Sequence, residues 1–278
     1  MNKFQHSIIL VLSCFLIFFQ QAIRSQNTRL LRNPAISSNK IAFCYASDIW
    51  IANLDGSESK RLTVFEGVES DPHFSPDGKT IAFSAEYEGN TDIYIVPIEG
   101  GEPKRLTWHP GPDIVIGWTP DGKNVLFVSG RTRAPRLYTD QLWTVSTSGT
   151  TPTRFILPRA INGKYSPDGN HFVFEKNMRW ETEFRVYRGG QNTSLKIFDF
   201  ANQTTEEIPW KNSWDNSPVW LGDDIFFLSD RDSVMNVWKF NYKTKDQKQL
   251  TFFKDFDCKN LEGAMVKSFL KKEVICLQ

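Results

Sequence analysis

Short apolar segments alternate with tight polar turns along most of the chain, and one turn recurs at three places. Residues 74–79 (FSPDGK) recur as 118–123 (WTPDGK) and 165–170 (YSPDGN), so the copies start 44 and 47 residues apart. In such a turn proline fixes φ, Asp bonds the backbone ahead of it, and glycine takes the positive φ that closes a hairpin. An aromatic residue precedes each turn and an apolar segment follows it. The pattern therefore predicts a repeated unit of strand, tight turn and strand.

Each unit continues into a third and a fourth strand. The third strands are expected at 48–51, 92–95, 141–144, 194–197 and 236–239. Outer strands contain the triplets at 61–63 (RLT), 105–107 (RLT) and 249–251 (QLT). Four antiparallel strands recurring every ~40–50 residues are typical of a β-propeller blade, whose faces are buried only by stacking against neighbouring blades.

We therefore predict an all-β fold, a β-propeller of four-stranded antiparallel blades, with five blades and an incomplete sixth. The blades are expected to begin near Ile36, Pro72, Gly117, Lys164 and Pro218. The fifth carries the turn at 220–224 (WLGDD) where the earlier blades have their Pro-Asp-Gly turn.

The two ends of the chain depart from this pattern. Lys3 and the apolar run 8–19 predict a signal peptide over residues 1–25. A retained membrane anchor is the alternative, although the run is shorter than the ~18 apolar residues that a membrane span needs. The propeller is then expected over 26–263. Residues 264–278 lack any blade pattern and are interpreted as an aberrant tail, for which a frameshift near Gly263 is a hypothesis that the nucleotide sequence would test.

Composition and charge exclude several classes of protein. The chain has 40% hydrophobic and 14% aromatic residues, which is ample for a packed core and excludes general disorder. With Lys+Arg 33 and Asp+Glu 32, the net charge of +1 offers no electrostatic surface for nucleic acid or an anionic membrane. We expect neither partner, beyond the membrane contact of the signal peptide.

The chain shows none of the sequence patterns that mark an active site. It has no G-x-S-x-G turn and no H-E-x-x-H zinc motif. His73, His109 and His171 occur singly and are predicted to be structural. The acidic segments 230–232 (DRD) and 255–257 (DFD) lack the spacing of a calcium loop and are predicted to be turns. We predict no catalytic residue, no cofactor and no metal, and a buried unreactive thiol at Cys44.

Residues 71–111 (DPHFSPDGKTIAFSAEYEGNTDIYIVPIEGGEPKRLTWHPG) resemble a blade of the six-bladed N-terminal propeller of tricorn-type serine peptidases. Segments 117–122, 187–190 and 222–232 fit the same family in the expected order, and the resemblance covers roughly 30–263. TolB-like proteins share the Ser-Pro-Asp-Gly turn. The resemblance implies a secreted, periplasmic propeller that filters, guides or holds peptides beside a proteolytic core. In that family a second propeller, a PDZ domain and two catalytic domains follow the first propeller, so the resemblance implies a serine peptidase as the parent protein.

Two long insertions carry most of the candidate binding chemistry. The candidate peptide-binding residues are Arg131, Arg133, Arg136, Arg185 and Arg188. Arginine binds carboxylates through a bidentate fork, so these side chains would suit peptide C-termini or acidic side chains. The alternative is an ordinary solvated surface with ion pairs to Glu181 and Glu183.

Three hypotheses for function follow. The leading one is a non-catalytic propeller domain that handles or gates peptides, with downstream peptidase domains as partners in a full-length protein. The alternative is a free-standing TolB-like propeller that binds protein partners. A third is an enzyme that uses the propeller channel, which requires paired carboxylates near one channel mouth.

Overall fold

The computed structural model describes residues 31–132, 140–177, 187–259 and 261. The chain divides into two units, Met1–Leu30 and Leu31–Gln278, and the described residues all belong to the second. This unit contains five four-stranded antiparallel sheets, and its described residues contain no helix. The predicted all-β fold of four-stranded blades is confirmed. Within the described ranges no helix has the length and apolar character of a membrane span.

Each blade is a sheet whose strands are ordered as they follow in the chain. The first blade comprises β1 (Arg32–Ile36), β2 (Lys40–Tyr45), β3 (Asp48–Asn53) and β4 (Lys60–Arg61). The second comprises β5 (Glu69–Phe74), β6 (Thr80–Ala85), β7 (Asp92–Pro97) and β8 (Lys104–Arg105). The third comprises β9 (Asp113–Trp118), β10 (Asn124–Ser129), β11 (Gln141–Ser146) and β12 (Thr153–Arg154). The fourth comprises β13 (Asn162–Tyr165), β14 (His171–Glu175), β15 (Lys196–Asp199) and β16 (Thr204–Glu207). The fifth comprises β17 (Asp215–Leu221), β18 (Asp224–Ser229), β19 (Asn236–Asn241) and β20 (Gln247–Gln249).

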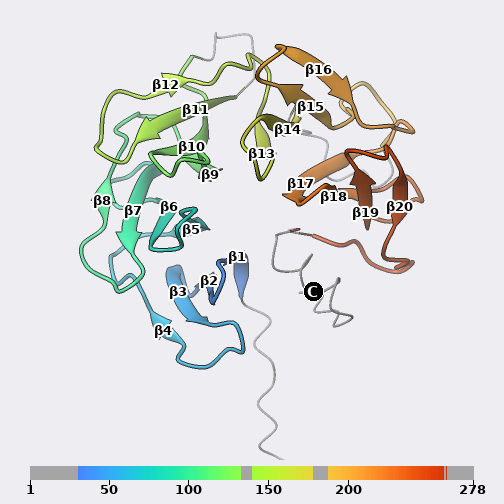
Figure 1. Cartoon of the computed structure of the whole chain (residues 1–278). Helices are drawn as coiled ribbons and strands as arrows, with labels where there is room; N and C mark the ends of the chain where they lie inside the picture. The colour runs from blue at the N-terminus through green and yellow to red at the C-terminus, as the bar shows by residue number, and fades with distance from the viewer. Residues whose placement is uncertain (1–30, 133–139, 178–186, 260, 262–278) are drawn as a thin grey trace, which may run out of the picture. The chain divides into compact units, whose positions relative to one another are not determined.

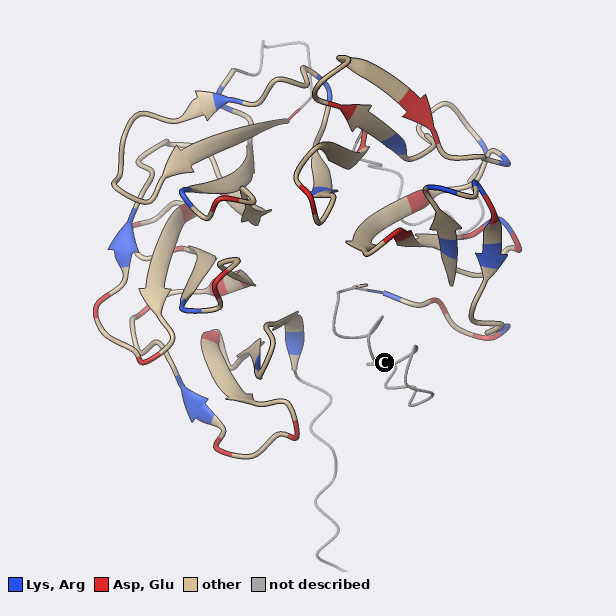
Figure 2. Ribbon diagram, in the orientation of Figure 1, with Lys and Arg blue, Asp and Glu red and all other residues tan. Residues whose placement is uncertain are grey.

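The five blades follow one another around a central space, with β1, β5, β9, β13 and β17 innermost (Figure 1). The resemblance implied six blades, whereas the structure describes five. Short outer strands at the rim carry basic residues, as Figure 2 shows for β4, β8 and β20.

The innermost strands begin at residues 32, 69, 113, 162 and 215, a few residues before the predicted blade starts. The cause is an irregular register near the start of four of these strands. At Asp71 and Ser217 the backbone takes a positive φ of 52°, and pairing continues on both sides. The following Pro72 and Pro218 lie inside the strands, because an irregular innermost strand tolerates a residue that donates no ladder hydrogen bond.

The Ser-Pro-Asp-Gly turns have the predicted chemistry. The Ser75 hydroxyl donates to Asp77 at 2.6 Å and accepts the Thr80 amide at 3.0 Å, while Gly78 has a φ of 71°. The turns beginning at Thr119 and Ser166 repeat these bonds. Side-chain hydrogen bonds and a left-handed glycine therefore close each hairpin locally.

Cross-strand aromatic pairs recur in the core, which otherwise consists mostly of aliphatic side chains between successive blades. Phe83 lies opposite Tyr94 in the second blade, and a phenylalanine lies opposite a tryptophan at the corresponding register of the third and fifth blades. Phe83, Phe127 and Phe227 have no exposed surface, whereas Phe43, opposite Trp50 in the first blade, is only half-buried. The difference follows from position, because no described strand covers that side of the first blade.

On the far side of the fifth blade, the residues after β20 follow the path of an innermost strand. The Cys258 amide donates to the Met235 carbonyl, which repeats the main-chain bond from the Glu69 amide to the Ser47 carbonyl at the start of the second blade. Cys258 and Leu261 pack into the apolar cluster of the fifth blade and are almost fully buried. The described residues after β20 thus cover the outer apolar face of the fifth blade.

Replacing Phe83 by Ala should destabilise the fold by about 3–5 kcal/mol, because it leaves a cavity between two blades. Replacing Phe43 by Ala should cost less than half as much, because that ring is partly exposed already. Urea titrations of both variants measure the difference. Equal losses would show that the outer face of the first blade is as tightly packed as an interior one.

Candidate functional site

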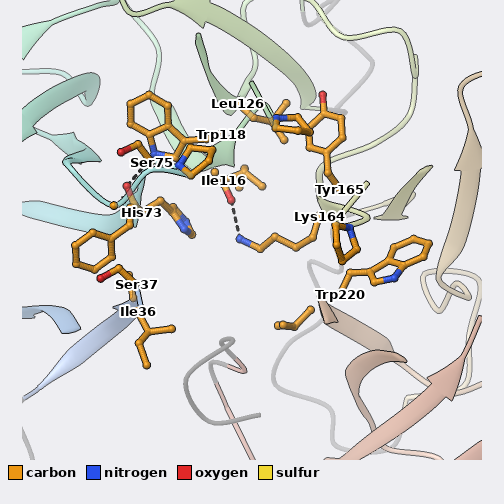
Figure 3. A pocket seen from close by; sticks show the side chains of 18 of the residues that line it. Ile36, Ser37, His73, Ser75, Ile116, Trp118, Leu126, Lys164, Tyr165 and Trp220 are labelled. Atoms are coloured by element: carbon orange, nitrogen blue, oxygen red, sulfur yellow. Dashed lines mark hydrogen bonds between the residues drawn. The ribbon is translucent and has the colours of Figure 1, made fainter. Parts of the chain in front are cut away.

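The innermost strands of all five blades line a central cavity of about 530 Å³. A second cavity of about 170 Å³ adjoins it. His73, Ile116 and Lys164 line both cavities and therefore lie at the boundary between them (Figure 3). The channel is narrowed at this point by side chains from the second, third and fourth blades.

Lys164 crosses the channel from β13. Its ammonium group donates to the main-chain carbonyl of Ile116 at 2.8 Å (Figure 3). The neighbouring Gly163 packs closely on β14, because a Cβ at this position would meet the Val173 carbonyl oxygen at 2.3 Å and the Phe172 ring. The strand therefore packs tightly on its neighbour with the long side chain of Lys164 on the channel side. The contact uses one of three ammonium donors and breaks without disturbing the strand.

His73 lies beside this ammonium group. Withdrawal from water, followed by the charge of Lys164, holds the pKa of His73 well below its usual value. The indole of Trp118 donates to the His73 carbonyl at 2.9 Å and fixes this part of β5 against the third blade. The imidazole is therefore neutral at physiological pH, and Lys164 supplies the positive charge at this boundary.

Each cavity has one carboxylate among its described lining residues, Asp77 in the larger and Asp71 in the smaller. Asp77 is held in its turn by Ser75, and its pKa is lowered by that hydrogen bond. Asp71 accepts from Asn33 and Ser70, both at 2.7 Å. The described lining thus gives neither cavity the paired carboxylates that glycoside chemistry requires.

Glu175 joins the fourth and fifth blades beside the smaller cavity. One of its oxygens accepts from the Ser217 amide at 2.9 Å and from the Asn162 amide group at 2.8 Å. Burial raises the pKa of Glu175 to about 7, although both hydrogen bonds act in the opposite direction. This carboxyl group changes charge near neutrality at a blade interface.

Arg131, predicted from sequence as a peptide-binding residue, is engaged inside the third blade. Its guanidinium forms an ion pair with the fully buried Asp113 at 2.6 Å and donates to Ser129 at 3.1 Å. It also lies over the rings of Phe127 and Trp143, about 5 Å from each centroid. These contacts hold the start of β9 to the end of β10.

The fifth blade repeats this arrangement with Arg231, which sequence reasoning did not single out. Arg231 pairs with buried Asp215 at 2.7 Å, donates to Ser229, and lies over Phe227 and Trp238. The second blade has a tyrosine in its place, and the Tyr87 hydroxyl donates to buried Glu69. The shared pattern Ser-x-Arg after the second strand is the signal that sequence analysis missed.

Of the other candidate arginines, Arg133, Arg136 and Arg185 lie outside the described residues. Arg188 forms an ion pair with Asp230 of the fifth blade at 2.9 Å and donates to its carbonyl oxygen. The structure therefore does not bring Arg131 and Arg188 into a common cluster. Whether the five arginines bind peptides stays a prediction.

The remaining sequence candidates have structural partners. His109 bonds within its own turn to Gly111, and His171 contacts the Tyr242 hydroxyl at 3.0 Å. Asp257 accepts the Met235 amide at 2.8 Å. The described residues contain no group of three or more metal-ligating side chains. Cys44 is buried, as predicted, and burial raises the pKa of its thiol to about 12.

Comparison with known proteins gives a consistent match over most of the chain. A family model described as the tricorn protease N-terminal β-propeller domain matches residues 28–267. The tricorn protease homolog of Saccharolobus solfataricus is 25% identical over 228 residues, which are 82% of this chain and 21% of that protein. The chain thus spans about a fifth of the length of this curated relative.

Solved structures agree with this match. The crystal structure of the tricorn protease is similar with a TM-score of 0.72 and 25% identity, over 84% of this chain and 23% of that one. A putative TolB from Agrobacterium tumefaciens shares the fold with a TM-score of 0.64 and 20% identity, over 80% of each chain.

Replacing Arg131 by Ala should destabilise the fold by about 3–5 kcal/mol, because Asp113 is then left as an unpaired buried charge. The double variant Asp113→Asn/Arg131→Met should recover part of this loss, because it leaves no charge behind. Chemical denaturation of the three proteins measures both effects. An Arg131→Ala protein as stable as the wild type would show that the ion pair contributes nothing to the stability of the fold.

The stability of the fold should fall as the pH rises from about 4.5 to about 7, in part because of Glu175. Its folded pKa of about 7 exceeds its ordinary value of 4.5, so in this window the folded state keeps a proton that the unfolded state releases. Urea midpoints across pH 4.5–8 should show a smaller decline in Glu175→Gln than in the wild type. Identical pH profiles would exclude Glu175 as a contributor.

Proposed function

Because the chain belongs to the family of tricorn protease N-terminal β-propeller domains, we propose that it is a non-catalytic domain that holds and gates peptides for a peptidase. The family assignment rests on the match over residues 28–267. The function of this chain within a peptidase is the proposal.

One observation carries this proposal, namely the boundary that Lys164 forms across the channel. The side chain lines both cavities, donates to the main-chain carbonyl of Ile116 and interacts electrostatically with Asp71. An extended peptide offers carbonyl oxygens of the same kind, so it can replace Ile116 as the acceptor as it enters. The aromatic surfaces of Trp118, Tyr165 and Trp220 line the larger cavity and suit apolar side chains of varied sequence.

The arginines of the two long insertions supply the second part of the proposal. Arg133, Arg136 and Arg185 bind carboxylates of the peptide, at its C-terminus or on acidic side chains. Arg131 and Arg188 stand apart from this set, because Asp113 and Asp230 already occupy their guanidinium groups. Both insertions connect the second to the third strand of their blades, so they belong to the same end of the sheets.

We further propose that the protein is exported through its residues 1–25 to the periplasm and acts with the catalytic domains of a serine peptidase. The apolar run at 8–19 supports export. The tricorn protease relatives, which are several times longer than the matched segment, support a peptidase partner. N-terminal sequencing of the exported protein tests the first part, because an intact Lys3 would contradict cleavage.

A second candidate function is a free-standing propeller that binds a protein partner. In the TolB structure the similar part makes up 80% of the chain, so a propeller of this fold forms most of another protein. The likeness shows the fold alone. Peptide binding inside the channel would support the first candidate function, and its absence would leave the second.

Labelled unstructured peptides with free C-termini should bind the chain, and fluorescence anisotropy measures the affinity. Lys164→Met and the double variant Arg133→Ala/Arg136→Ala should each weaken binding more than tenfold, which corresponds to about 1.4 kcal/mol. C-terminally amidated peptides should lose affinity for the wild type and show little further loss in the arginine variant.

Lys123→Ala is the matched control, because Lys123 is exposed on a turn and lies outside both cavities. If both test variants bind peptides as the wild type does, neither Lys164 in the channel nor the two arginines contribute to peptide binding, and the proposal is refuted. Peptide hydrolysis that serine-directed inhibitors abolish would contradict the non-catalytic assignment.

A further inference from the structure

Exposed apolar side chains gather in one kind of connection, the one that leads from the outer strand of a blade to the innermost strand of the next. Exposed residues of this kind are Val64, Phe65, Val68, Trp108, Ile156, Phe252 and Phe256. In the described part of the chain, only Leu31 and Leu54 are large exposed apolar residues elsewhere. Such a concentration is unusual for a surface that only water covers.

These connections share one end of the sheets. In a four-stranded antiparallel blade, the connection to the next blade leaves from the same end as the loop between the second and third strands. The opposite end carries the Ser-Pro-Asp-Gly turns, whose exposed residues include Asp77, Asp121 and Asp168. Seven of the nine large exposed apolar residues of the described chain therefore lie at the other end of the blades, together with charged residues of the loops there. We refer to the end with the seven apolar residues as the apolar face.

Two of the connections are built alike but differ in charge. Residues 62–66 read LTVFE and residues 250–254 read LTFFK. Both start from a buried Thr hydroxyl that accepts a main-chain amide of the third strand, at 3.0 Å in the first blade and 2.9 Å in the fifth. Val64 and Phe252 then stand out, 68% and 71% exposed. Two positions later Glu66 and Lys254 are both exposed.

We infer that the apolar face binds the apolar face of a second copy of this chain in a twofold dimer. The connection 62–68 of one protomer lies against the connection 250–256 of its partner. In a twofold interface a contact formed once is formed again by symmetry. Glu66 then meets the partner's Lys254, and Lys254 meets the partner's Glu66, while the apolar residues on either side pack together.

The exposed acidic groups at the first two blades favour a second copy over an anionic lipid surface there, while Arg159, Lys211 and Lys254 are exposed at the same end of the later blades. Glu66, Glu86 and Glu88 are exposed around the connections of the first two blades, and they would be repelled by anionic headgroups. A partner protomer supplies lysine at the matching place. The opposite charges of Glu66 and Lys254 can pair with each other only if a second copy of the chain covers the face.

Sedimentation velocity on the whole chain tests the dimer. The wild type should associate at about 100 µM or below, which a modest apolar interface allows. Val64→Ser/Phe252→Ser should be monomeric over the same range. Leu54→Ser is the matched control, because Leu54 is 52% exposed at the opposite end of the first blade, and it should leave association unchanged.

A charge exchange tests the pairing itself. Glu66→Lys alone and Lys254→Glu alone should each weaken association by about tenfold, because each places like charges together twice in the dimer. The double variant Glu66→Lys/Lys254→Glu should restore it. Because both residues are exposed, far-UV spectra and urea midpoints should be unchanged and exclude misfolding as the cause.

Three results would overturn the proposal. One is a wild type that stays monomeric at the highest concentration. Another is an association that survives Val64→Ser/Phe252→Ser or that the double charge variant fails to restore, which would assign it to another surface. The third is a monomer that binds phosphatidylglycerol vesicles through Val64 and Phe252, which would assign the face to lipid.

Discussion

Each blade has two apolar faces, and a four-stranded sheet buries both only when a neighbour stands on either side. The second blade shows this directly, because Phe83 packs against the first blade while Ala82 packs against the third. Other contacts act within single sheets. The Ser-Pro-Asp-Gly-type turns close hairpins at one end of three sheets, and at the other end buried Glu69, Asp113 and Asp215 bond to residues after the second strand.

The stacking also creates the channel. The innermost strands of the five blades surround the axis without filling the centre, and their residues line two cavities. These strands contain proline and positive-φ residues that a central strand would not tolerate. The irregular backbone is therefore concentrated where side chains project into the channel, and Lys164 lines both cavities there.

Local features of the fold were predictable from the sequence, and contacts between distant residues were not. The Ser-Pro-Asp-Gly turns and the strands after them follow from chemistry within six residues, so their prediction succeeded. The blades were expected to begin near Ile36 and Pro72, and the innermost strands of these blades begin at residues 32 and 69, where the register irregularity at Asp71 is invisible in the sequence. Arg131 was assigned to binding because Asp113, its partner, lies 18 residues earlier in another strand. Lys164 was named only as a blade start, since nothing in its neighbours shows which way its side chain projects.

The stacking of blades has a consequence for how the molecule loses its structure. A closed ring has no terminal unit, whereas an array in which each sheet touches only its sequence neighbours behaves as a linear polymer with two ends. Fluctuations in such a polymer start at the ends, where a unit is held by one interface instead of two. The two ends here are unequal, because Cys258 and Leu261 cover the fifth blade while Phe43 of the first stays half-open. Among the described blades, the first is therefore expected to open before the fifth, whereas the third is flanked by two blades and carries the buried Arg131–Asp113 pair.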